Sequence, residues 1–336
     1  MATEGTRSVP ASGVSSAEKT TSWQERLFEV LRQRGAILVL VITVILASLR
    51  FNNFLSATNL ENVALQSAFL GIIVVGMTFV IIGAGIDLSV GSQLALSGVL
   101  AAYAVKISWP LALVVPVLVC GAIGLAQGLL IAKAKMAPFI VTLAGLLGVR
   151  GLALALSNEQ NVLIKGTSSF IWFGQGQVLG VATPILFMLA AFAIGGVVLV
   201  RTGYGQATFA VGDNEESARL MGLPVERIKI IAYTTNGALA GLAGVLLAAQ
   251  LSSGQPTVGQ GWELNAISSV VVGGTLLSGG AGTMSGSLAG VLLLNILQNL
   301  INQVGTLGSY AQQVVSGAFL IVVVVVQAYL TRKERL

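Results

Sequence analysis

Ten apolar segments, separated by short polar stretches, occupy most of this chain. Most of them approach the roughly 20 residues that a helix needs to cross a bilayer. They do not alternate between polar and apolar positions, and they exceed the roughly 10-residue strands of a membrane barrel. The pattern therefore predicts an all-α polytopic membrane protein with about ten transmembrane helices. The expected segments are 36–50, 62–82, 88–105, 110–131, 138–157, 181–200, 232–250, 264–278, 285–303 and 311–330.

Two of these segments, 88–105 and 264–278, are shorter than a full span and adjoin glycine-rich breaks. Non-helical backbone at membrane depth is tolerated where it is buried in protein. We therefore expect broken or re-entrant helices at both places. The glycines at the breaks are Gly85, Gly91, Gly273, Gly274, Gly279, Gly280, Gly282 and Gly286.

Composition agrees with a membrane location. Of the 336 residues, 55% are hydrophobic and only 9% are charged, whereas a soluble domain carries about 25% charged residues. The single cysteine, Cys120, lies in an apolar run, so no disulfide can form within the chain. Histidine is absent, which excludes histidine-based triads and histidine metal sites. We expect no enzymatic activity, no cofactor or metal, and no nucleic-acid partner, because the charges cluster at segment ends.

The basic residues define an expected orientation. If the N-terminus is cytoplasmic and ten segments alternate in direction, 14 of the 18 lysines and arginines lie on the cytoplasmic side. This distribution satisfies the positive-inside rule and places both termini in the cytoplasm. We expect a cytoplasmic tail with a short interfacial helix at 1–34, a transmembrane domain at 35–331 and a cytoplasmic tail at 332–336.

The largest expected cytoplasmic loop, 201–231, has the signals of a short helix. Asp213 is a suitable N-cap, with Glu216 three residues later as its capping-box partner. Gly222 suits the residue after the helix, and Pro224 prevents continuation. A segment that only connects two membrane helices would not need a capped helix of about two turns with both acidic and basic residues. A docking surface for a cytoplasmic partner is therefore at least as well supported.

A second polar stretch interrupts two apolar segments at 83–92 and contains Asp87. A carboxylate near membrane depth is costly and needs partners. With Ser89 and Ser92, Asp87 can cap the following helix. We favour this capping interpretation over a role in a pathway or gate.

The glycine-rich stretch 273–286 is not a phosphate loop, because the chain has no Gly-Lys dipeptide. Gly282, Gly286 and Gly290 instead form small-xxx-small steps, as do the glycines at 124/128 and 237/241. Such steps allow close helix–helix packing in membranes. Tight packing around a helix break is therefore favoured over a flexible gate.

Neutral amides also lie at expected membrane depth. They suit hydrogen bonding to a hydroxylated solute, and equally suit bonding between helices. With the polar residues of the break, they give the pathway or gate candidates Asp87, Ser89, Ser92, Asn236, Asn295 and Asn299.

Several stretches together resemble the ribose-type permeases of bacterial ABC sugar importers. They read GMTFVII at 76–82, IDLSVGS at 86–92, PFIVTL at 138–143 and GDNEESARLMG at 212–222. The last stretch contains VGGT at 272–275, SGG at 278–280 and Gly286. The resemblance covers about residues 50–330 in collinear order. Ser217 and Met221 stand where alanine and serine are more usual in the family, and Ala144 replaces a common glycine.

The resemblance implies a bacterial inner-membrane subunit that imports a monosaccharide or a similar small neutral solute. It also implies a second permease copy, a cytoplasmic ATPase that binds the ATP, a soluble sugar-binding protein outside, and membrane lipid. The stretch 212–222 is similar to the family's coupling helix, which rests on the ATPase. Its expected coupling residues are Gly212, Asp213, Asn214, Glu215, Glu216, Ala218, Arg219 and Gly222.

Other interpretations stay open from sequence alone. An ATP-independent transporter or facilitator would need ion-coupling groups in the membrane, and Asp87 is the one acidic candidate. A membrane-embedded enzyme lacks a nucleophile and base, and a membrane scaffold would show no solute flux. The sequence does not select one sugar or polyol. Expected outer contacts with the binding protein are Glu61, Glu159, Lys165 and Glu263.

Overall fold

The computed structural model describes residues 23–304 except Thr167, together with the isolated residues 314, 317, 318, 321 and 325. The expected tail before residue 23, most of the expected last segment 311–330, and the tail 332–336 lie outside these residues.

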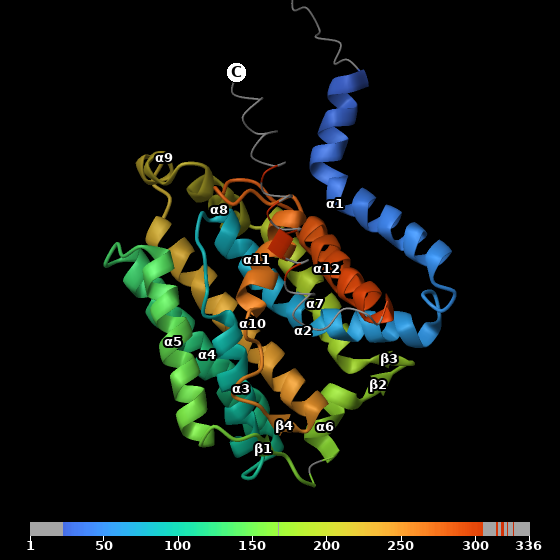
Figure 1. Ribbon diagram of the computed structural model, residues 1–336. Helices are drawn as coiled ribbons and strands as arrows, with labels where there is room; N and C mark the ends of the chain where they lie inside the picture. The colour runs from blue at the N-terminus through green and yellow to red at the C-terminus, as the bar shows by residue number, and fades with distance from the viewer. Residues whose placement is uncertain are drawn as a thin grey trace, which may run out of the picture.

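The described chain is a bundle of helices with two minimal strand pairs (Figure 1). Antiparallel pairs join β1 (Val162–Leu163) to β4 (Ser253–Gly254) and β2 (Gln177–Val178) to β3 (Val181–Ala182). The helices are α1 (Trp23–Arg50), α2 (Ala57–Ile82), α3 (Val90–Ala104), α4 (Trp109–Ala132), α5 (Pro138–Ser157), α6 (Ser168–Gln175), α7 (Thr183–Arg201), α8 (Gly203–Asp213), α9 (Glu215–Leu220), α10 (Val225–Leu251), α11 (Trp262–Val272) and α12 (Met284–Val304).

Six of these helices are long and apolar enough to cross a membrane, namely α2, α4, α5, α7, α10 and α12. Shorter apolar helices cover Ala36–Arg50, Val90–Ala104 and Trp262–Val272. The polytopic helical fold is therefore as expected, although the described residues do not establish ten spans. Residues 23–34, where an interfacial helix is expected, form the first part of α1, which runs from Trp23 to Arg50.

Helix α2 lies at the centre of the bundle. Its most apolar stretch is 89% buried, against 22% for α5 at the periphery. Helices α7, α10, α11 and α12 pack around it. The core consists mainly of aliphatic side chains from these helices, such as Ile72 and Ile73 of α2, Leu246 of α10 and Val270 of α11.

Glycines permit the close packing of α4 against α10. A Cβ added to Gly124 would overlap the carbonyl oxygen of Tyr233, and one added to Gly237 would overlap that of Cys120. The backbones of α4 and α10 therefore approach so closely that a residue larger than glycine would not fit at these positions, as the small-xxx-small spacing predicts. Gly286 packs in the same way against the backbone of Gly273.

Two half-length helices begin after non-helical segments. Residues 83–89 form a non-helical connection from α2 to α3, which has 15 residues (Figure 1). Residues 255–261 lead into α11, which has 11 residues. Both short helices occur where the sequence predicts broken or re-entrant segments.

The bundle has two recognisable ends. One, called here the α9 end, carries α8, α9 and the glycine loop 273–283, whose Gly280 amide donates to the carbonyl of Ile82. The other, the β1 end, carries β1, β4 and α6, where the Ile164 amide donates to the carbonyl of Ser252. The expected cytoplasmic loop 201–231 thus consists of α8, α9 and the beginning of α10.

Candidate functional site

Helix α9 is capped at its beginning by Asn214. The Asn214 side chain accepts a hydrogen bond of 2.8 Å from the Ser217 amide. The prediction that Asp213 is the N-cap is wrong, because Asp213 is the last residue of α8. Only Asn214 separates the two helices, with extended backbone (φ −155°, ψ 106°), so the chain turns one residue later than predicted.

The end of α9 follows the prediction. Gly222 has a φ of +80°, a conformation that glycine adopts without strain. Its amide donates to the carbonyl of Arg219, and the next amide, of Leu223, donates to the carbonyl of Ala218. This paired pattern is a Schellman motif. Buried Ala218 packs with Val211, Val225 and Ile228, which fixes α9 against α8 and α10.

Ion pairs fasten α9 to the first turns of α10. Glu215 pairs with Lys229, and Arg219 pairs with Glu226 and, at 3.4 Å, with Glu215. The hydrogen bond from Lys229 is the main cause that lowers the pKa of Glu215 below its ordinary value. Leu220 and Met221 at the tip of the helix are 84% and 68% exposed. The α9 corner is therefore a braced projection with an apolar tip.

The last turn of α8 packs on the end of α2 and on the glycine loop. A Cβ added to Gly212 would overlap the carbonyl oxygen of Ile82. That oxygen accepts a hydrogen bond of 2.9 Å from the amide of Gly280. Gly279 and Gly280 have φ values of +89° and +78°, which favour glycine. The base of the α9 corner therefore contacts both α2 and the glycine loop.

A buried polar network occupies the break before α3. The Asp87 carboxylate accepts hydrogen bonds from the Ser89 amide (2.9 Å), the Ser89 hydroxyl (2.6 Å) and Asn236 Nδ2 (2.8 Å). Asp87 and Asn236 are fully buried. The predicted capping role is only partly right, because Ser89 occupies the N-cap position and Asp87 binds Ser89 instead of the first helical turn.

The network extends to other helices through Ser89 and Ser92. The Ser89 hydroxyl accepts from Gln93 (2.8 Å) and from Gln127 on α4 (3.0 Å). Ser92 donates to the carbonyl of Leu146 on α5 (2.8 Å). Asp87, Ser89, Ser92 and Asn236 thus lie together and join α3, α4, α5 and α10. The hydrogen bonds of this network hold these helices together, which is what a structural role for the four residues requires.

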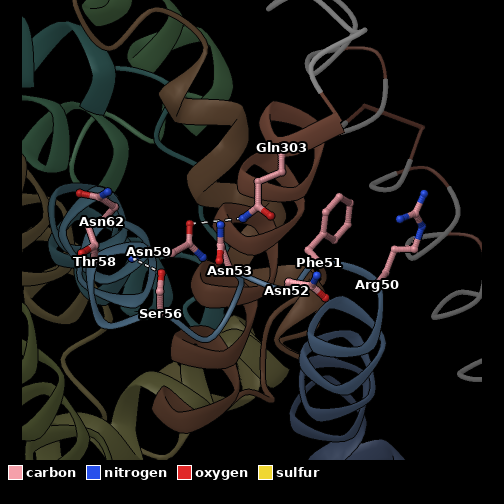
Figure 2. A pocket seen from close by; sticks show the side chains of 9 residues that line it. All are labelled: Arg50, Phe51, Asn52, Asn53, Ser56, Thr58, Asn59, Asn62 and Gln303. Carbon is pink, nitrogen blue, oxygen red and sulfur yellow. Dashed lines mark hydrogen bonds between the residues drawn. The ribbon is translucent and has the colours of Figure 1, made fainter.

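The other predicted pathway residues lie elsewhere. Asn295 is buried and donates to the carbonyl of Val291 within α12. Asn299 donates to Asn59, beside an open pocket of about 490 Å³ (Figure 2). This pocket contains mostly neutral polar side chains and one arginine. It is lined by Arg50, Phe51, Asn52, Asn53, Ser56, Thr58, Asn59, Asn62 and Gln303.

One contact that the sequence interpretation did not identify joins α5 to the segment before α11. Arg150 donates to the carbonyl oxygens of Pro256 (2.6 Å) and Val258 (2.7 Å). Glu263 is half-buried and close enough to attract Arg150 electrostatically. The Glu263 carboxylate lies beside Gly91 at the beginning of α3, and its expected contact with a binding protein stays a prediction. An arginine inside an apolar segment is the signal that could have revealed the contact.

No group of three histidine, cysteine, aspartate or glutamate side chains that could hold a metal occurs within the described residues. Of the expected outer contacts, Glu61 accepts a hydrogen bond of 3.0 Å from Gln177. These sites offer hydrogen-bonding groups and exposed surfaces for docking.

Comparison with known proteins agrees with the resemblance seen in the motifs. The family model for the permease component of branched-chain amino acid transport systems matches residues 59–324. The ribose import permease of Bacillus subtilis is 42% identical, over 91% of this chain and 94% of the relative. That of Escherichia coli K12 is 40% identical, over 88% and 94%. An L-arabinose ABC transporter permease of Azospirillum brasilense is 36% identical, over 92% and 91%.

No solved structure matches the chain. The family assignment therefore stands on the sequence matches, which cover nearly all of this chain and of each relative. The chain belongs to the family of membrane permeases that includes the ribose import permeases and the L-arabinose ABC transporter permease.

Proposed function

We propose that this chain is the membrane-spanning subunit of an ABC importer in the bacterial cytoplasmic (inner) membrane. It carries a monosaccharide, or a similar small neutral polar solute, into the cell. Relatives named for ribose import and for L-arabinose transport support this class of solute. The energy comes from ATP hydrolysis in a separate subunit, and two copies of this chain form one pathway.

In this proposal the α9 end faces the cytoplasm, as do both termini. Arg201, Arg219, Arg227 and Lys229 are concentrated at this end, in agreement with the positive-inside rule. The β1 end then faces outward, toward a soluble solute-binding protein.

The single observation that carries the proposal is the construction of the α9 corner. Its ion pairs point toward α10, whereas Leu220 and Met221 project from the surface. Exposed apolar side chains on a rigid projection outside the membrane suit insertion into a groove of a protein partner. The ATPase is that partner.

Movement of the ATPase reaches the membrane helices by two routes. The ion pairs and the cluster around Ala218 connect α9 to α10, which spans the bundle. Contact of Gly212 with Ile82 and Gly280 connects α8 to α2 and to the glycine loop. Closure of the ATPase then alternates access to the pathway between the two sides of the membrane.

The test uses proteoliposomes that contain this chain with its ATPase and binding protein. Replacing both Leu220 and Met221 by serine is expected to abolish ATPase association and solute-stimulated hydrolysis. Leu179, which is 100% exposed on the β2–β3 hairpin, provides the control. Leu179→Ser keeps both activities. Retention of association and stimulation by the double serine variant would disprove the docking role of the tip.

The alternative is an ATP-independent transporter or facilitator. Asp87 does not favour ion coupling, because three hydrogen bonds already satisfy its carboxylate. Solute uptake by the permease in vesicles that lack the ATPase would establish the alternative and refute ATP-driven import.

A further inference from the structure

The non-helical segment 255–261 follows β4 and runs along α3 from Gly98, where Gly254 packs, to Gly91, where Gly259 packs. It precedes α11, whose 11 residues lead to the glycine loop at the α9 end, and it meets the beginning of α3, whose 15 residues lead toward the β1 end. At about 1.5 Å per residue these helices measure about 16 and 22 Å. A hydrocarbon core is about 30 Å thick, so segment 255–261 lies within it.

Close packing fixes this segment against α3 and α5. A Cβ added to Gly91 would overlap the carbonyl oxygen of Gly259. On the other side, Arg150 of α5 binds the carbonyl oxygens of Pro256 and Val258. The segment is therefore an ordered part of the bundle, and its backbone and side chains keep a fixed position relative to α3 and α5.

Polar groups of the same segment remain exposed. The side chains of Thr257 and Gln260 are exposed, and their backbone amides donate no hydrogen bond to the described residues. On α5, whose Arg150 binds the segment, Gly148 and Gly151 are exposed and have open space where a side chain would lie. Free amides and polar side chains at this depth cannot face lipid, because hydrocarbon offers them no partner.

Other exposed surfaces of the bundle differ from this face. Leu118 of α4 and Ile194 of α7 are each 65% exposed, and their helices carry apolar side chains around them. Such surfaces suit contact with lipid. The exposed surface of Thr257 and Gln260, called here the polar face, needs water or protein instead.

We infer that the polar face lines the translocation pathway and that a second copy of this chain closes the pathway opposite it. Thr257, Gln260 and their free backbone amides form hydrogen bonds with the hydroxyl groups of a neutral solute as it passes the middle of the membrane. The glycines at 148 and 151 keep the pathway wide enough for the solute. This inference rests on the proposed function and specifies the residues that contact the solute.

Single cysteines in the complete transport complex test the inference. The background is Cys120→Ala, because the native cysteine is buried. Thr257→Cys and Gln260→Cys are expected to react with a membrane-impermeant thiol reagent, and ribose, the probe solute, is expected to reduce their labelling. Leu118→Cys is the lipid-facing control, and Leu179→Cys on the exposed hairpin is the positive control.

The outcomes separate this inference from the proposed function. If positions 257 and 260 react no faster than position 118 while uptake remains ATP-dependent, the polar face is not the pathway and only this inference fails. Labelling at both positions without any effect of ribose would likewise exclude them as solute contacts. If both positions label and ribose protects them but uptake needs no ATPase, the pathway is right and ATP-driven import is wrong.

A second pair of variants tests the width of the pathway. Gly148→Leu is expected to abolish uptake without loss of assembly, because a side chain there meets open space within the chain. Gly148→Ala is expected to retain uptake, since one methyl group occupies little of the pathway. Full uptake by Gly148→Leu would show that no solute passes this position.

Discussion

The amide of Gly280 donates a hydrogen bond of 2.9 Å to the carbonyl oxygen of Ile82, and Gly212 packs on the same carbonyl. Three segments that are distant in sequence thus meet at one atom: α2, α8 and the glycine loop. The contact joins the base of the α9 corner to α2, the helix at the centre of the bundle.

Gly212→Ala is expected to break this contact, because its Cβ would overlap the Ile82 carbonyl. Overpacking of this kind costs about 1–3 kcal/mol. We expect a lower thermal midpoint and loss of coupling between ATP hydrolysis and uptake in proteoliposomes. Gly203→Ala is the control, since a Cβ at Gly203 in the same helix meets nothing within 4 Å. Equal behaviour of the two variants would show that the contact transmits nothing.

The pair Asp87–Asn236 joins the break before α3 to the middle of α10. Asp87→Asn places an amide NH₂ opposite the Asn236 amide NH₂, so at least one donor loses its partner. An unpaired buried polar group costs about 1–3 kcal/mol. We expect a lower thermal midpoint in detergent and recovery in the exchanged variant Asp87→Asn/Asn236→Asp, which restores a donor opposite an acceptor. No recovery would mean that burial of the charge, and not the pairing, determines stability.

The contact between Glu215 and Lys229 predicts a pH effect at the α9 corner. The lowered pKa of Glu215 means that its carboxylate stabilises the folded corner above the ordinary pKa of 4.5. This contribution is lost as the pH falls below 4.5 through the lowered value. Because the side chain of Glu215 is half exposed, the pair contributes about 0.2–1 kcal/mol.

Hydrogen exchange measures this contribution. Glu215→Gln is expected to lower the amide protection factors of α9 at neutral pH by up to about fivefold, the equivalent of 1 kcal/mol. In the wild type the same loss appears only in acid. Glu216→Gln, at an exposed neighbouring position, serves as the control. Unchanged protection in Glu215→Gln would show that the cap and the Ala218 cluster alone hold the corner.

The sequence predicted the helices well because their signal is local. A long apolar run identifies a membrane helix whatever surrounds it. Gly222 followed by Pro224 likewise marks a helix end without any information about neighbouring helices. The N-cap was misplaced by one residue because Asp213 and Asn214 are both good caps. In the structure α8 continues through Asp213, with Gly212 packed on the end of α2.

The spatial grouping of polar residues could not be predicted in this way. Asn236 and Asn299 are both amides in apolar segments, yet one binds Asp87 and the other binds Asn59 beside the pocket. From sequence, Glu263 is interpreted as a charged loop residue. In the structure, the re-entrant segment 255–261 places it close to Arg150. Such contacts depend on which helices are neighbours, and one chain's hydrophobic pattern does not specify that.

Arg150 holds the segment 255–261 on α5, and its removal is expected to release that segment. In Arg150→Met the carbonyls of Pro256 and Val258 lose their donor and Glu263 loses its positive neighbour. Unpaired buried polar groups cost about 1–3 kcal/mol each, so the thermal midpoint should fall and uptake should be lost. Arg150→Lys should recover only part, because lysine is one bond shorter and does not place its ammonium where Arg150 Nη1 binds both carbonyls.

The double variant Arg150→Met/Glu263→Gln separates the two causes. If the unpaired carboxylate dominates the loss, the second substitution restores much of the thermal midpoint. If the carbonyl clamp dominates, the double variant stays as unstable as Arg150→Met, and uptake stays absent in both because the polar face has lost its shape. Leu147→Met, at an exposed position of the same helix, should leave both measurements unchanged. Wild-type stability and uptake in Arg150→Met would show that packing of Gly91 on Gly259 is sufficient to position the segment.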